Sequence, residues 1–300
     1  MRHRAPPKQN SPLISGLVVA TFGRSFAVEL TDSEIISCTT RGRRGSLACG
    51  DRVAVMRTSS DQGVIEATDP RSTLFYRSDA FRQKLLAANV TQVVVVVAPW
   101  PVFSGDLLDR CLIAAEHAGA RSVIVLNKSD LPEATAARQR LALYPALGYE
   151  VVPISAKYDV ATLAPCLAGH TSLLIGESGM GKSTIVNRLL PEARAATAEV
   201  SRYLEAGKHT TSHARLYHLG PESHIVDAPG LQAFGLRHLD RRDLAHAFVE
   251  FRPLLGQCRF ADCRHLKEPD CAVVRAADGG GIAEQRLKVY RRLLEEVDGS

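Results

Sequence analysis

Short apolar runs, separated by glycine, serine, aspartate and arginine, make up the first part of the chain beyond residue 12. They cover residues 16–21, 25–30, 35–38, 52–56 and 63–67. Each run has the length of a β-strand, and several short strands at this spacing are typical of a small antiparallel barrel. We therefore predict an N-terminal β-barrel over residues 13–72.

Near residue 81 the pattern changes to apolar runs that alternate with helical segments. Residues 93–98 contain a run of valines without a polar face, which indicates a strand buried on both sides. Residues 107–118 have the apolar spacing of a helix. Further buried runs lie at residues 122–126, 151–154 and 172–175. This alternation predicts a parallel sheet covered by helices on both faces, within a domain of residues 73–238.

The remaining segments extend this plan. Residues 215–219 and 224–226 predict a hairpin that adds an edge strand to the sheet. After residue 239 the chain becomes helical, and it closes with an amphipathic helix over residues 282–297. We predict a small helical domain over residues 239–300.

Composition excludes several classes of protein. With 45% hydrophobic and 23% charged residues, this chain of 300 residues can bury a core, unlike a disordered chain. The longest apolar run, residues 93–98, is far shorter than the roughly 20 residues that cross a bilayer. Residues 1–12 are basic but lead into no signal peptide. We expect a cytoplasmic monomer that does not bind membranes.

The net charge of +5 is too small to establish a nucleic-acid partner, so its distribution matters more. Residues 1–12 have the composition of a disordered tail, with a basic arm that touches a polyanion as the alternative. Arg41, Arg43 and Arg44 lie between two predicted strands. They form either a solvated loop or a loop that contacts phosphates.

One glycine-rich segment follows an apolar strand and precedes a helix, which is the context of a phosphate-binding loop. Its glycines let successive backbone N–H groups point at a phosphate, Lys182 brings a charge to the phosphate oxygens, and Ser183 offers a hydroxyl to Mg²⁺. The residues that we expect to hold the phosphates are Gly176, Glu177, Ser178, Gly179, Met180, Gly181, Lys182, Ser183 and Thr184.

Two further motifs follow predicted strands and indicate the base. Asn127, Lys128 and Asp130 come after one strand, where an aspartate can accept the N1–H and 2-amino hydrogens of guanine. Ser155, Ala156 and Lys157 come after another, where a backbone N–H can reach the guanine carbonyl. Each motif alone fits an ordinary strand-end turn. Together with the phosphate loop they predict a site for GTP or GDP, and an ATP site is the weaker interpretation.

Asp227 and Gly230 end the predicted edge strand, where a nucleoside triphosphatase places a carboxylate for the metal and an N–H for the γ-phosphate. Thr210 and Thr211 lie in a polar stretch without clear periodicity. Either threonine can complete the coordination shell of Mg²⁺, which would make this stretch a nucleotide-dependent switch. Without the other motifs, the stretch fits an ordinary exposed loop. We predict Ser183, Thr210, Thr211 and Asp227 as Mg²⁺ ligands.

The order of the motifs is unusual. A Ras-like GTPase runs from the phosphate loop through the switch threonine and Asp-x-x-Gly to Asn-Lys-x-Asp and Ser-Ala. Here the last two come first. A domain whose termini lie close together tolerates this rearrangement, so the order predicts a circularly permuted GTPase domain.

Cys258, Cys263, His265 and Cys271 offer three thiolates and an imidazole within a short stretch. This set suits a tetrahedral zinc ion, and four protein ligands leave no open position for catalysis. We therefore predict a structural zinc. The remaining cysteines are scattered, which favours a reducing compartment over a disulfide framework.

Taken together, these motifs resemble the circularly permuted ribosome-assembly GTPases, the small-ribosomal-subunit-dependent GTPase A (RsgA) family of bacteria. The resemblance extends to Gly50-Asp-Arg-Val53, to the segment from Asp227 to Leu236, and to Glu268-Pro269 within the cysteine cluster. It implies an N-terminal OB-fold barrel, a central permuted Ras-like P-loop GTPase and a C-terminal zinc domain. It also implies that the protein binds the small (30S) ribosomal subunit and its rRNA late in maturation, and hydrolyses GTP there.

The residue that orients the attacking water is the open point of the mechanism. Leu231 stands where Ras-like enzymes carry glutamine, and an apolar side chain cannot orient water. The resemblance suggests His238 for this role, although alone it fits a surface histidine. We expect slow hydrolysis by Lys182, Thr210, Thr211 and His238, accelerated by the ribosomal subunit. The alternative is a GTP-controlled rRNA-binding checkpoint or chaperone in which hydrolysis is incidental.

Overall fold

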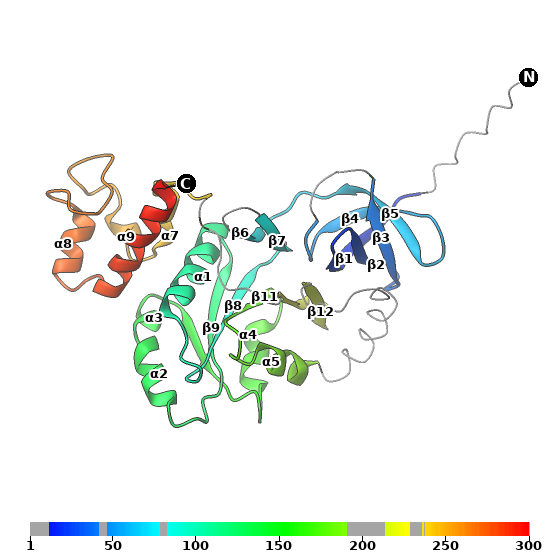
Figure 1. Cartoon of the computed structure of the whole chain (residues 1–300), viewed down its shortest axis with the longest axis horizontal. Helices are drawn as coiled ribbons and strands as arrows, with labels where there is room; N and C mark the ends of the chain where they lie inside the picture. The colour runs from blue at the N-terminus through cyan, green and yellow to red at the C-terminus, as the bar shows by residue number, and fades with distance from the viewer. Residues whose placement is uncertain are drawn as a thin grey trace, which may run out of the picture.

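The computed structural model describes residues 12–41, 47–78, 83–190, 214–228, 236 and 238–299. Within these residues the buried apolar side chains form three clusters: one in the N-terminal barrel, one around the central sheet and one in the C-terminal helices. Figure 1 shows the same three parts along the chain, from the blue strands through the green α/β region to the red C-terminal helix. The domain limits at residues 12, 72 and 238 stay predictions.

The barrel has five strands, as the sequence predicts. Its strand order is β1-β2-β3-β5-β4, and a further β1–β4 pairing closes it. All of these pairs are antiparallel except β3–β5. Val18, Val28 and Val55 are fully buried inside it. The strands are β1 (Ile14–Phe22), β2 (Ser25–Leu30), β3 (Ile35–Thr40), β4 (Arg52–Arg57) and β5 (Gln62–Thr68).

A two-stranded hairpin, β6 (Leu74–Ser78) and β7 (Gln83–Ala88), joins the barrel to the central sheet. Apolar periodicity does not predict this hairpin, because charged and polar residues interrupt its short apolar runs. Asp51 anchors the junction, since its buried carboxylate accepts two hydrogen bonds of 2.7 Å from Arg71. The Nδ2 of Asn89 also donates to the carbonyl of Gly50 at 2.9 Å.

The central sheet has the predicted parallel core. Strands β10, β9, β8, β11 and β13 lie side by side in that order, and all are parallel to their neighbours. Every residue of β8 is buried, in agreement with its run of valines. The strands are β8 (Gln92–Val97), β9 (Arg121–Leu126), β10 (Glu150–Pro153), β11 (Thr171–Ile175), β12 (Arg215–Gly220) and β13 (Ser223–Asp227).

Helices cover both faces of this sheet. Figure 1 shows α1, α2 and α3 on one side and α4 and α5 on the other. The longest is α1, whose side-chain cap is Ser104 and whose end is Gly119 in the left-handed conformation. The helices are α1 (Gly105–Ala118), α2 (Ala134–Leu141), α3 (Leu143–Ala146), the 3-10 turn η1 (Ala161–Leu163), α4 (Ala164–Leu167) and α5 (Lys182–Leu189).

The hairpin of β12 and β13 is confirmed, but the prediction that it supplies the edge of the sheet is wrong. Strand β12 pairs with β1 of the barrel through Ala20 and Arg215, so the two sheets join into one of eleven strands. This pairing joins strands that are about 190 residues apart in sequence, beyond the reach of local periodicity.

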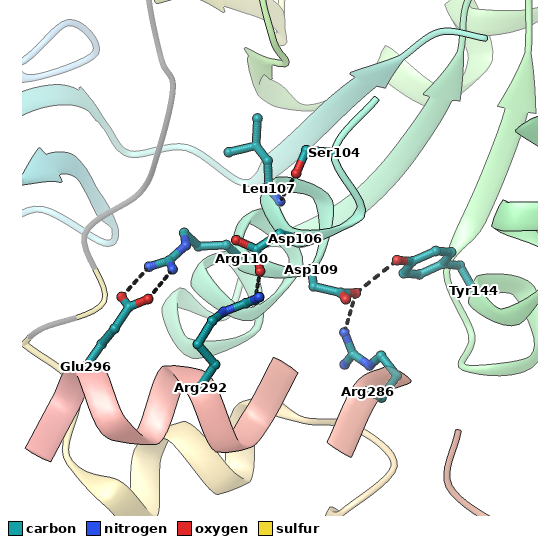
Figure 2. Close-up of polar contacts among 9 residues, drawn as sticks. All are labelled: Ser104, Asp106, Leu107, Asp109, Arg110, Tyr144, Arg286, Arg292 and Glu296. Carbon is teal, nitrogen blue, oxygen red and sulfur yellow. Dashed lines mark hydrogen bonds and ion pairs between the residues drawn. The ribbon is translucent and has the colours of Figure 1, made fainter. Parts of the chain in front are cut away.

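The C-terminal helices pack against α1 through a group of charged side chains (Figure 2). Arg286 and Asp109 are completely buried, and their Nη1 and Oδ1 atoms lie 2.7 Å apart. Arg110 makes two hydrogen bonds of 2.6 and 2.8 Å to Glu296, and Arg292 pairs with Asp106. The helical elements here are α7 (Arg241–Ala247), the 3-10 turn η2 (Arg252–Leu254), α8 (Ala272–Asp278) and α9 (Glu284–Asp298).

Candidate nucleotide site and metal centre

The predicted phosphate loop connects the end of β11 to the first residue of α5, Lys182. Two glycines in it cannot be replaced without a clash. A Cβ on Gly176 would lie 2.3 Å from the carbonyl oxygen of Val96, and one on Gly181 would lie 2.2 Å from the Nδ2 of Asn127. Both glycines also have positive φ, 153° and 92°. The sequence therefore forms a tight strand-to-helix turn with exposed N–H groups at the start of a helix, which suits an anion.

Lys182 lies over this loop. Its Nζ donates to the carbonyl oxygens of Gly176 at 2.6 Å and Glu177 at 2.9 Å. Burial lowers the pKa of the ammonium group, while the carboxylates of Asp227 and Glu177 act in the opposite direction. Phosphate oxygens would offer this half-buried cation a full negative charge in place of two neutral carbonyl oxygens.

Asn127 ties the base motifs to the phosphate loop. Its buried side chain donates from Nδ2 to the carbonyl of Met180 at 2.8 Å and accepts the N–H of Ala156 at 3.0 Å. Asn127 therefore joins the phosphate loop to the segment that follows β10. In this structure the N–H of Ala156 is already bonded to Asn127. The N–H of Lys157 has no partner among the described residues and is free to donate to guanine.

Asp130 lies exposed beside Ser155, whose hydroxyl donates to its Oδ1. This hydrogen bond is the main cause that lowers the pKa of Asp130, so the side chain is an acceptor at neutral pH. Lys128 has a positive φ of 56°, and its Nζ donates to the carbonyl of Trp100 at 2.7 Å.

Asp227 ends β13, directly beside Leu174 of the strand that enters the phosphate loop. Ser183 and Thr184 are exposed in the first turn of α5. The structure thus brings Asp227 and Ser183 to the same end of the sheet. The predicted residues Thr210, Thr211 and Gly230, together with Leu231, Arg43 and Arg44, lie outside the described residues.

The metal cluster forms as predicted. The ligand atoms of Cys258, Cys263, His265 and Cys271 all lie within 4.8 Å of one another. The Sγ atoms of Cys258 and Cys271 are 3.8 Å apart, and the Nδ1 of His265 lies 3.6 and 3.4 Å from them. Zn–S bonds of about 2.3 Å and Zn–N bonds of about 2.0 Å in a tetrahedron give edges of about 3.5 to 3.8 Å. The four residues therefore fit a closed zinc site.

Comparison with known proteins agrees with this geometry. The family model for the RsgA GTPases matches residues 68–237, more than half of the chain. A small ribosomal subunit biogenesis GTPase RsgA of Nitrosomonas europaea is 49% identical over 99% of this chain and 96% of its own length. The chain belongs to the RsgA GTPase family. A protein of the same name from Burkholderia pseudomallei strain K96243 is 48% identical over 98% of each chain.

Solved structures share the fold of this RsgA family member. The crystal structure of YjeQ from Thermotoga maritima superposes with a TM-score of 0.74 at 30% identity, over 96% of this chain and 99% of that one. YloQ, described as a circularly permuted GTPase, has the same fold, with a TM-score of 0.71 at 24% identity and 98% coverage of both chains. The predicted fold class of barrel, permuted GTPase domain and C-terminal zinc-binding helices is confirmed.

Membership of the RsgA family makes the chain a GTP hydrolase and implies GTP or GDP and Mg²⁺, and the cysteine cluster adds zinc. The residues present fit all three groups. The glycine cradle and Lys182 fit the phosphates, Ser183 and Asp227 supply oxygen ligands that Mg²⁺ prefers, and the cysteine cluster fits zinc. None of the described helices is long and apolar enough to span a membrane.

His238 does not lie at the phosphate loop in this structure. Its ring centroid is 4.7 Å from that of Tyr76 on the hairpin and 5.3 Å from that of His117 in the last turn of α1. The phosphate loop contacts the other end of this helix, at Ser104, which the helical rise places about 20 Å away. The structure therefore gives no support to the assignment of His238 as the residue that orients water.

The loop of residues 98–104, between β8 and α1, carries none of the sequence motifs and yet lies at the phosphate loop. The N–H of Ser104 donates to the Oε2 of Glu177 at 2.8 Å, and Pro101 packs against Gly179 of the phosphate loop. A signal for this loop exists in the sequence, because two prolines and two aromatic residues directly follow the most apolar strand. Loops at the carboxyl ends of parallel strands line ligand sites.

Proposed function

We propose that this GTPase binds the small (30S) ribosomal subunit through its rRNA and couples GTP hydrolysis to a late step of subunit maturation, such as the release of an assembly factor. The observation that carries the proposal is the near-complete match to the Nitrosomonas protein, whose name assigns it to small-subunit biogenesis. The match spans the barrel and the zinc-binding helices as well as the GTPase domain, so the proposal concerns the whole chain.

Within the nucleotide site we propose one role for each group. Asp130 accepts the N1–H and 2-amino hydrogens of guanine, and the N–H of Lys157 donates to its carbonyl. Lys182 neutralises charge on the β and γ phosphates. Ser183 and Asp227 hold Mg²⁺, with Thr210 or Thr211 added in the GTP state. Bound Mg²⁺ withdraws charge from the phosphates during transfer.

The decisive experiment measures the GTPase rate and co-pelleting of the full chain with small subunits, with large subunits and with no ribosomes. We expect slow turnover alone and acceleration only by small subunits. Binding should be tighter with a non-hydrolysable GTP analogue than with GDP. Equal rates with and without small subunits would contradict the proposal, and so would equal stimulation by large subunits.

The second candidate is an rRNA-binding checkpoint in which hydrolysis is incidental. Dissociation of the protein from the subunit distinguishes it from the first candidate. If hydrolysis drives release, protein bound with the non-hydrolysable analogue stays on the subunit while protein bound with GTP dissociates. Equal dissociation favours the checkpoint. The proposed role of His238 is tested in the same assay, since His238→Ala loses stimulated turnover while retaining subunit binding only if the imidazole acts in the reaction.

We propose that the barrel supplies part of the RNA contact. The Arg41 side chain is 60% exposed and its only described acidic partner is Glu66, at 3.1 Å. Together with Arg43 and Arg44, which lie outside the described residues, it gives a basic stretch of sequence, whose contacts with phosphates would make subunit binding sensitive to salt. Neutral substitutions at the three arginines test this contact. If they leave the subunit affinity and its salt dependence unchanged, the proposed contact between the barrel and RNA is refuted. A monomer in the cytoplasm is consistent with such a partner.

A further inference from the structure

An exposed apolar pair lies beside the nucleotide site without a described function. Trp100 and Val102 are 64% and 62% exposed, whereas their neighbours Ala98 and Phe103 are buried. They belong to the loop of residues 98–104 that follows β8. Trp100 is the only tryptophan of the chain. A large apolar side chain held in water beside an active site is the feature that needs an explanation.

The backbone of this loop is fixed although these side chains are exposed. The carbonyl of Trp100 accepts the Nζ of Lys128, and Ser104 donates its N–H to Glu177. Phe103 lies under the guanidinium group of Arg140, 4.1 Å from its ring centroid, and its carbonyl accepts the Nη2 of Arg140 at 2.8 Å. An aromatic ring on a fixed backbone loses little conformational entropy when it binds, so the loop is prepared for a partner.

Charge next to the pair indicates an anionic partner. Lys128 and Arg140 flank the loop, and both hydrogen bond to neutral backbone carbonyls rather than to a carboxylate among the described residues. A tryptophan face with cations beside it is the arrangement with which proteins stack on unpaired bases and contact the adjoining phosphates.

The small area of the exposed pair favours RNA over a protein as the partner. A stable protein interface needs about 800 Å² from each side, with several buried anchor residues. Two adjacent side chains offer much less, but one indole ring matches the face of one base. The guanine of GTP is not this base in our assignment, because Asp130 and Lys157 hold it at the ends of β9 and β10, whereas Trp100 follows β8.

We propose that Trp100 stacks on an unpaired base of RNA that reaches the rim of the nucleotide site when the ribosomal subunit docks, with Arg140 near the adjoining phosphate. The proposal rests on the proposed function, because the subunit supplies the RNA. It places an RNA contact three residues before Phe103, in the loop that leads into α1. This contact lies next to the phosphate loop and is separate from the barrel.

The fluorescence of Trp100 tests this directly, since no other tryptophan contributes. The full chain, bound to GDP or to a non-hydrolysable GTP analogue, is titrated with a single-stranded RNA hexamer and with a matched hexamer of abasic nucleotides. We expect saturable quenching by the first and none by the second. Contacts of RNA with the barrel alone do not reach this indole, so the readout is local.

Substitutions of single residues provide a second test of the proposal. Trp100→Ala should weaken labelled-hexamer binding about tenfold and Trp100→Phe much less, because phenylalanine keeps a stacking face. Arg140→Gln should reduce the salt dependence of binding. Phe260→Ala is the matched control, since Phe260 is also an exposed aromatic residue, at 41%, but lies in the C-terminal part. Trp100→Ala should also lower the ratio of small-subunit-stimulated to unstimulated GTP turnover, and Phe260→Ala should not.

Three results would overturn the proposal. Fluorescence that does not respond to RNA, with Trp100→Ala binding small subunits as tightly as wild type, removes the contact. Quenching by GTP alone, with no further effect of RNA, assigns Trp100 to the bound nucleotide. Weaker binding of Trp100→Ala to small subunits and to RNA-free ribosomal proteins, with unchanged binding of RNA, assigns Trp100 to a protein contact. Failure of the proposed function is seen separately, as wild-type turnover that small subunits do not stimulate.

Discussion

The buried charges between α1 and α9 allow a quantitative prediction (Figure 2). Arg286 is completely buried and pairs with Asp109, which is also completely buried, and with Glu250, whose side chain is 6% exposed. In Arg286→Met the two carboxylates lose their shared cation while staying out of water. Breaking a buried ion pair in this way costs about 3–5 kcal/mol of folding free energy.

The comparison variant is Asp109→Asn. The Oδ1 of Asp109 accepts from both Arg286 and Tyr144, whereas its Oδ2 is buried without a partner among the described residues. An asparagine keeps the accepting oxygen, and Glu250 still neutralises Arg286. We therefore expect a loss of only about 1 kcal/mol. Lys288→Met is the surface control, because it breaks an exposed pair with Glu284 and should change stability by less than about 0.5 kcal/mol.

The pH dependence provides an independent check. Burial raises the pKa of Asp109, and Arg286 partly opposes this shift. Without Arg286 the pKa rises further, so the native state binds a proton that the unfolded chain releases above its normal pKa of about 3.9. Stability then falls as the pH rises through this window. The deficit of Arg286→Met should therefore shrink when the pH is lowered from 8 towards 5.

Calorimetry of the three variants and the wild type, with hydrogen exchange of α9, measures these differences. A midpoint shift of roughly 2–4 °C per kcal/mol is expected for domains of about 150–250 residues. The reasoning is refuted if Arg286→Met loses no more stability than Lys288→Met, or if its deficit does not change with pH.

Three further predictions concern the two sites. Asp130→Asn should shift the nucleotide preference from GTP towards XTP by at least tenfold in competition binding, because an amide can donate to the 2-oxygen of xanthine. Unchanged selectivity would exclude Asp130 as the residue that recognises the base. Gly181→Ala should weaken GTP binding at least tenfold in titration calorimetry, because the new Cβ would clash with Asn127. Gly220→Ala is the control, since a Cβ there meets no atom within 4 Å, and normal GTP affinity of Gly181→Ala would contradict the loop geometry. Cys271→Ser should remove about one zinc per chain by metal analysis and unfold the C-terminal helices first, and zinc content equal to wild type would refute the ligand assignment.

Local sequence signals predict the strands and the motifs well. The barrel strands, the buried β8 and the helix α9 follow from apolar periodicity, because each buries one or two faces against neighbours. The phosphate loop and the zinc ligands follow from chemistry that requires particular residue types at fixed spacing. Each of these motifs lies within one short segment of the chain.

Contacts between distant segments could not be predicted in this way. The pairing of β1 with β12 and the ion pairs of α1 with α9 join residues up to about 190 positions apart, and a single sequence holds no periodicity at that range. The position of His238 depends on Tyr76 and His117, two residues that nothing in the sequence connects to it. The exposure of Trp100 likewise depends on where the chain turns after β8, not on its composition.

The pairing of β1 with β12 also has a consequence for synthesis of the chain. Strands β8, β9 and β10 leave the ribosome before β11 and β13, so the base-binding side of the sheet can form while the phosphate-binding side is still missing. Until residues 171–227 follow, β8 keeps an open edge that can pair with another chain, and the part of β1 near Ala20, beyond its pairing with β4, lacks β12. A nascent or truncated product that stops before β11 is therefore the species of this protein most exposed to aggregation.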